Sequence, residues 1–369
     1  MKKSILIIIF IMLISCSNVY GEFAEPLTAY TEKAVVLAVE ETEEVEEIEG
    51  ILSKIQYIQL KITSGKYKGQ IFETENHMSD NIAYDIVVQK GDRVVVVIEE
   101  YENEYIEVYI SDYARQSQIF YLLGLFVLLI ILIGKKKGIK AILTLAITII
   151  MVVKILLPLM LKGINPIPIS IIICILITVV TILIISGFNN KSIAAIIGTC
   201  SGFIIAGIIA YIVGINIRLT GLSAEEATML MYLPQEIDFD FKSLLFSGII
   251  LGALGAIMDV GMSIASSIEE IHNANKNLTK KELFNAGMNV GKDIMGTMTN
   301  TLILAYTGSS IPLLLLFMGY ETSMIKIMNL DIIATEIVRS LSGSIGLVLT
   351  IPLTALIATA LIKREGKSY

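Results

Sequence analysis

The chain has 369 residues, of which 54% are hydrophobic and 17% are charged, and its formal net charge is −7. Residues 22–116 hold 21 acidic and 8 basic side chains, and so acidic a region argues against nucleic acid as a partner, because phosphate contacts need Lys and Arg. Beyond this region, from about Gln118 to Lys363, apolar runs recur at roughly the 20-residue length that crosses a bilayer. Together these features predict an acidic domain joined to an α-helical polytopic membrane bundle.

The first 21 residues have the features of a secretory signal. Lys2 and Lys3 precede an apolar stretch from Ile5 to Ile14, which is short for a membrane span. Three interpretations stay open: a lipoprotein signal with Cys16 lipidated after cleavage, a signal peptide cleaved near Val19-Tyr20-Gly21, and an uncleaved anchor. All three place the following residues outside the cytoplasm.

Residues 22–116 are predicted to form a small extracytoplasmic β-barrel-like domain. Segments rich in β-branched and aromatic residues are predicted as strands over residues 33–39, 54–63, 69–75, 84–88, 93–99 and 104–110. Five or six short strands suit a small barrel, OB-like or similar. The acidic run from Glu40 to Glu49 is expected to be a solvated loop. A divalent-cation site is the alternative, although the run lacks EF-hand spacing.

Residues 117–363 are predicted to cross the membrane seven times, and residues 364–369 to form a cytoplasmic tail. The predicted spans lie near residues 118–133, 139–160, 167–187, 192–215, 243–268, 295–318 and 341–362. Residues 216–242 are expected to form an outer loop with a short interfacial helix.

The basic residues of the short loops predict the orientation, because such loops stay in the cytoplasm. With seven spans four groups of them fall on one side, and these groups are Lys135, Lys136, Lys137 and Lys140; Lys191; Lys276, Lys280, Lys281 and Lys292; and Lys363, Arg364 and Lys367. We therefore expect a multi-pass protein of the bacterial plasma membrane, with the β domain outside and the C-terminus in the cytoplasm.

The fifth predicted span carries the strongest functional candidate, Asp259. Its small and polar residues recur every three or four positions and so share one helix face; they are Gly248, Gly252, Gly255, Asp259, Ser263, Ser266 and Glu270. An unpaired carboxylate in hydrocarbon is costly and often marks a pathway. We predict that Asp259 relays a proton or cation, with Ser263 and Ser266 beside the path.

Polar residues in the last two spans extend this candidate path. Asp293 is a second relay candidate, although a negative charge there could instead cap the sixth span's N-terminus. Gly308-Ser309-Ser310-Ile311-Pro312 interrupts the same span, and such a break can free backbone carbonyls for an ion or substrate. The further path candidates are Thr297, Asn300, Thr301, Ser309, Ser310, Glu336 and Arg339. Helix packing is the competing interpretation for the Ser, Thr and Gly positions.

The sequence shows no enzyme signature. GxSxG, HExxH, P-loop and CxxC motifs are all missing, and Cys174 and Cys200 lie inside apolar runs, which argues against a zinc cluster or a disulfide framework. An intramembrane aspartyl protease would need a second membrane carboxylate. Asp259 has only Asp293 as such a partner, and the surrounding motifs do not fit that class. We expect no catalytic residue, no metal and no cofactor.

The segment from Gly252 to Phe317 resembles the YibE/F family of bacterial multi-pass membrane proteins. The resemblance rests on GALGAIMDVGMSIASSIEEI and KKELFNAGMNVGKDIMGTMTNTLILAYTGSSIPLLLLF, and on the overall plan beyond about residue 30. It implies the membrane architecture but no substrate. The order of an Asp-bearing span, a cytoplasmic loop and a span that opens with Asp and Thr is also similar to resistance-nodulation-division permeases and SecDF subunits, in which membrane carboxylates relay protons.

Two functions remain open. The first is a proton- or cation-coupled permease for a small solute or ion, with its path along the last three spans. The second is a scaffold or sensor that transports nothing and whose β domain binds a partner. The lipid bilayer is an expected partner in both cases, and a homo-oligomer or another membrane partner is left open.

Overall fold

The structure is a computed structural model that describes residues 29–47, 51–78, 85–100, 106–233, 239–320 and 323–362. The chain divides into two compact units with a boundary between Leu129 and Ile130, and each is described by itself. The predicted signal segment with its lipidation candidate Cys16 lies outside the described residues, as does the predicted tail.

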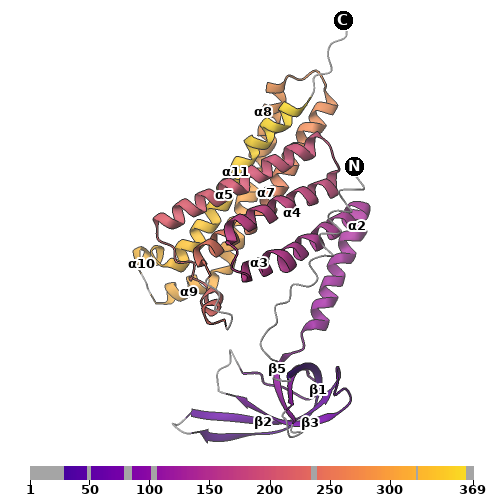
Figure 1. The fold of residues 1–369 in the computed structure, drawn as a ribbon, viewed down its shortest axis with the longest axis vertical. Helices are drawn as coiled ribbons and strands as arrows, with labels where there is room; N and C mark the ends of the chain where they lie inside the picture. Colours follow the sequence, from indigo (N-terminus) through magenta and orange to yellow (C-terminus); the bar gives the residue numbers. More distant parts are fainter. Residues whose placement is uncertain are drawn as a thin grey trace. The chain divides into compact units, whose positions relative to one another are not determined.

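The first unit contains one antiparallel sheet, which curls into a half-barrel (Figure 1). Its strands lie in the order β3-β2-β1-β4-β5. They are β1 (Ala29–Glu47), β2 (Ile51–Ile62), β3 (Ile71–Met78), β4 (Arg93–Glu100) and β5 (Ile106–Tyr113). Alternate apolar residues such as Val36, Leu60 and Val96 point into a single core. The edge strands approach each other, and the Thr74 hydroxyl donates to the Val108 carbonyl. The predicted β-barrel-like domain is thus confirmed as an open barrel.

Two details of the predicted β domain are wrong. The expected loop from Glu40 to Glu49 is mostly strand, because β1 runs on to Glu47 and pairs antiparallel with β2, with Glu47 opposite Ile51. The segment 84–88 is not a strand over its described residues. Side chains take its backbone bonds instead: Gln56 donates to the Val88 carbonyl, and Asn76 donates to the Ile86 carbonyl.

The second unit is a helical bundle. Its helices are α2 (Gln116–Met151, which begins in the first unit), the π-turn η1 (Val152–Leu156), α3 (Leu157–Leu161), α4 (Pro166–Ser186), α5 (Asn190–Asn216), α6 (Glu225–Met229), η2 (Leu230–Tyr232), α7 (Phe241–Ala274), α8 (Lys280–Ser309), α9 (Ile311–Gly319), α10 (Met324–Met328) and α11 (Asp331–Leu361). In the described chain, five helices are long and apolar enough to span a membrane, or six if α8 and α9 form one bent span. The chain is therefore a multi-pass membrane protein.

The first of these five helices, Gln116–Leu161, is divided at Lys135. This residue has φ 48° and ψ −125°, which is not helical. A Cβ on Gly138 would stand 2.1 Å from the Ile130 carbonyl oxygen, so the chain folds back tightly here. The two halves match the predicted spans 118–133 and 139–160. All seven predicted segments are therefore helical, and the count of six is lower by one because Gln116–Leu161 is counted once although it is divided at Lys135.

The sixth predicted span differs from the structure at both ends. α8 begins at Lys280 rather than near residue 295, because Thr279 and Glu282 form a capping box there. It ends at Ser309, and α9 continues at an angle of 59°. The helix break predicted at Ser309 and Ser310 is therefore present.

The core of the bundle is formed by α5, α7 and α11, with α8 packed against α7 and α11 (Figure 1). Small residues bring these helices close together. A Cβ on Gly291 of α8 would stand 2.1 Å from Ile351 of α11 and 3.3 Å from Ile264 of α7. Close contacts of this kind are typical of helix packing in membranes, and they leave the outer faces of α7 and α8 uncovered.

Candidate functional site

The outer face of α7 carries the main relay candidate. Asp259 and Ser263 are exposed on the bundle surface, and Gly255 has open space where a Cβ would stand. Within the described chain, no residue forms a hydrogen bond or an ion pair with Asp259. Ser266 is half-buried, and its hydroxyl contacts the Met262 sulfur at 3.8 Å. The carboxylate of Asp259 thus lies near the middle of a membrane helix without a partner in the described structure.

The outer face of α8 is polar as well. The candidates Asp293, Thr297, Asn300 and Thr301 are all exposed. Thr297 and Thr301 donate to carbonyls of their own helix, at 2.9 Å in both cases. No described residue pairs with the Asp293 carboxylate or the Asn300 carboxamide. Of these four candidates, Asp293 and Asn300 are therefore the ones without a hydrogen-bond partner among the described residues.

Contacts between α7 and α8 place the two polar faces at the same depth. The helices run antiparallel, with Gly287 against Ile268 and Gly291 against Ile264. Asp259 lies five residues before Ile264 on α7. Because α8 runs antiparallel, the position at the same depth on α8 lies five residues after Gly291, at residue 296, next to Thr297. By the same register Ser263 is level with Asp293. The structure therefore brings these candidates to matching depths, although no contact joins them.

A second cluster connects α7, α8 and α11. A Cβ on Gly252 would stand 2.8 Å from the Tyr306 hydroxyl, and the Arg339 guanidinium lies 5.9 Å from the centre of the Tyr306 ring. Arg339 also forms an ion pair with Glu336 at 2.6 Å, while the other carboxylate oxygen of Glu336 is buried without a hydrogen bond. Gly252 lies two turns from Asp259 on the same helix face, about 10 Å along the axis. Tyr306 thus lies beside the predicted pair of Glu336 and Arg339. It was not among the residues predicted from the sequence.

At the break between α8 and α9, two serine side chains already donate hydrogen bonds to a backbone carbonyl. The Ser309 hydroxyl donates to the Tyr306 carbonyl at 2.7 Å, and the Ser310 hydroxyl donates to the same oxygen at 3.2 Å. The Tyr306 carbonyl therefore needs no bound ion to complete its hydrogen bonding. An ion or substrate at this break would have to displace these serine contacts.

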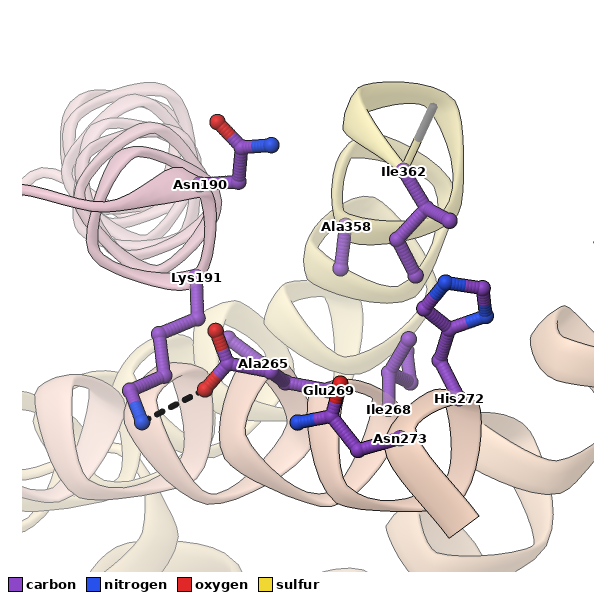
Figure 2. Close-up of a pocket in the computed structure, with 9 residues that line it drawn as sticks. All are labelled: Asn190, Lys191, Ala265, Ile268, Glu269, His272, Asn273, Ala358 and Ile362. Atoms are coloured by element: carbon purple, nitrogen blue, oxygen red, sulfur yellow. Dashed lines mark ion pairs between the residues drawn. The ribbon is translucent and has the colours of Figure 1, made fainter. Parts of the chain in front are cut away.

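A separate cavity of about 160 Å³ opens where α5 begins and α7 and α11 end (Figure 2). Lys191 and Glu269 form an ion pair there at 2.6 Å, and Asn190 donates to the Leu361 carbonyl at 3.1 Å. The Nδ1 atom of His272 is buried without a hydrogen-bond partner. The described residues contain no group of three His, Cys, Asp or Glu side chains that could hold a metal ion.

Sequence reasoning used Lys191 only for orientation and did not single out Lys154. Lys154 is exposed in η1, inside the second predicted span, and it has an interaction partner of its own. π-Turns often occur at functional sites. A lysine inside an apolar run is unusual, so the sequence alone could have marked Lys154 as a candidate residue.

Two family models match the chain. The YibE/F-like protein model covers residues 122–364, which is more than half of the chain, and the YibE/F family N-terminal domain model covers residues 28–113. The chain belongs to the YibE/F family. The N-terminal model covers the described half-barrel, and the larger model covers every membrane candidate from Asp259 to Arg339. A comparison of this YibE/F protein with curated proteins returns no match, and neither does a comparison with solved structures.

Proposed function

We propose that this YibE/F protein is a proton- or cation-coupled permease in which Asp259 is the relay carboxylate. The observation that carries the proposal is Asp259 itself, an acidic side chain near the middle of α7 with no partner among the described residues. A charged group in hydrocarbon costs several kcal/mol, roughly 3 or more. An acid without a salt bridge is stable there when it binds a proton or a cation, and binding and release of that ion is the chemistry of a relay.

The surrounding face supports a path from Asp259 towards the start of α11. Gly255 and Gly252 lead along α7 to Tyr306, which contacts the Glu336–Arg339 pair through its ring. Asp293 lies on the other side, level with Ser263. Groups that can accept or donate a proton therefore lie at both ends of the polar face. The proposal includes no catalytic step and no cofactor.

We also propose the orientation that the loop charges favour, with the β domain outside and the C-terminus in the cytoplasm. We count seven crossings, with α2 counted as two at Lys135 and the α8–α9 pair as one. This count keeps the four groups of basic residues used for the orientation on one side. This orientation places the half-barrel where a secretory signal would deliver it.

Carbodiimide labelling tests the relay directly, because the reagent modifies a protonated carboxyl group in an apolar site. We expect the wild type to be labelled at Asp259 and labelling to fall as the pH rises. Asp259→Asn should remove the label at this position, and Glu226→Gln, which changes an exposed carboxylate of α6 outside the long apolar helices, is the control that should keep it. Equal labelling of the wild type and Asp259→Asn would show that Asp259 does not hold an exchangeable proton.

Everted membrane vesicles with a pH-sensitive dye test transport. A panel of monovalent cations, divalent cations and small organic solutes is added to vesicles that hold a pH gradient. A permease collapses the gradient for its own solute, and Asp259→Asn should insert normally but lose this response. The scaffold alternative gives the opposite result, because a strain that produces the protein without residues 22–116 would then lose its phenotype while Asp259→Asn keeps it.

A further inference from the structure

The outer faces of α7 and α8 leave polar groups at membrane depth that lipid cannot satisfy. Asp259 and Ser263 on α7 are exposed, as are Asp293 and Asn300 on α8, and none of these four has a hydrogen bond with a described residue. Gly255 and Gly296 both have open space around them. A surface with small residues and free hydrogen-bonding groups suits another helix rather than acyl chains.

We propose that a second copy of this chain covers this face, so that α7 of one protomer packs against α8 of its partner. The proposal deepens the one for Asp259, because the partner would then contribute side chains to the relay site. The hydrogen-bonding groups are complementary: Asp259 is an acceptor, and the Asn300 carboxamide is a free donor about one turn away in depth.

Symmetry is compatible with this pairing. Two copies inserted in the same direction are related by a two-fold axis along the membrane normal, and such an axis leaves the depth of each residue unchanged. Asp259 is level with position 296, next to Thr297, within one protomer, so it is level with the same position of its partner. The same contact forms twice, once for each α7.

The chain's own first helix is a poorer occupant. The residues of α2 from Ile119 to Ile133 are all apolar apart from Tyr121 and Gly124, and they offer no carboxamide for Asp259. Lys154, the cation of the next segment, already has an interaction partner. A second copy supplies the missing donors without rearranging the bundle.

Cross-linking between two differently tagged copies tests the interface in native membranes. Cys174 and Cys200 are replaced by alanine in both copies, and Cys16 is common to every variant. One copy carries Gly255→Cys and the other carries Thr301→Cys, two exposed positions at equal depth. We expect a covalent product that contains both tags. The matched control pairs Gly255→Cys with Ile345→Cys, which is exposed at a similar depth on α11, and it should give no such product.

A second measurement uses the intact interface. The mass of the purified wild type should be that of a dimer, and Asn300→Leu should weaken dimerisation by about 3- to 30-fold for each lost contact. A monomeric wild type, or equal cross-linking of the test and control pairs, would overturn the interface. Carbodiimide labelling of Asp259 needs no dimer, so it separates failure of this inference from failure of the relay.

Discussion

Gly202 in α5 and Gly346 in α11 are in backbone contact, since a Cβ on Gly346 would stand 2.6 Å from the Gly202 carbonyl oxygen. A side chain at this crossing cannot be accommodated by rotating a neighbour, because the obstacle is backbone. The crossing lies in the core of the bundle, where α5, α7 and α11 meet.

Gly346→Ala is therefore expected to destabilise the bundle by about 1–3 kcal/mol, the usual range for overpacking. The measurement is thermal unfolding of the purified protein in one detergent. Gly124→Ala is the matched control, because Gly124 lies in a helix with nothing within 4 Å of its added Cβ. Unfolding temperatures that fall equally for both variants would contradict the contact.

The half-barrel should show a pH dependence that comes from one ion pair. Lys66 and Tyr67 both donate to Glu100. The bond from Lys66, followed by that from Tyr67, lowers the pKa of Glu100 below its ordinary 4.5. The bond to Glu100 raises the pKa of Lys66 to about 12 from an ordinary 10.5.

The two shifts act at opposite ends of the pH scale. Glu100 stabilises the fold above pH 4.5, and this contribution is lost as the pH falls through its lowered pKa. Lys66 contributes below pH 10.5, and its contribution is lost as the pH rises through about 12. The protection factors of the β4 amides in the full chain, which compare each exchange rate with the intrinsic rate at the same pH, should therefore fall at both extremes. Glu100→Gln should flatten both limbs, and an unchanged profile in that variant would count against the pair.

The pair between Lys191 and Glu269 should contribute little to stability despite its short distance. Both side chains are partly exposed, at 21% and 32%, and pairs of this kind are usually worth about 0.2–1 kcal/mol. A double-mutant cycle with Lys191→Met and Glu269→Gln measures the coupling by thermal unfolding. A coupling well above this range would mean that the cavity holds the pair away from water.

The broad plan of the protein could be predicted from its sequence because long apolar runs and alternating strands are local signals. The seven apolar segments are all helical, and the break at Ser309 and Ser310 is present. The apolar segments 118–133 and 139–160, with lysines between them, predict the turn that the structure has at Lys135. The residue that takes the non-helical conformation could not be predicted, since a lysine with φ 48° has no sequence signature. The strand predicted at 84–88 failed because Gln56 and Asn76, which are distant in sequence, hold that backbone instead.

The candidate site was predicted less completely. Periodicity placed Asp259 and Ser263 on one helix face, and it placed Asp293, Thr297 and Asn300 on another. It could not show that both faces point away from the bundle, because this depends on which sides of α7 and α8 pack inwards. The link from Gly252 through Tyr306 to Arg339 joins three separate helices, and no local pattern encodes it.

The contact between Thr74 and Val108 also bears on how the chain avoids aggregation. A sheet with two bare edges offers unpaired backbone groups on which another polypeptide can add a strand. In this domain β3 and β5 are those edges, and they shield one another across the open side of the half-barrel. The described edges of the half-barrel are therefore less open to an added strand than the edges of a flat sheet would be.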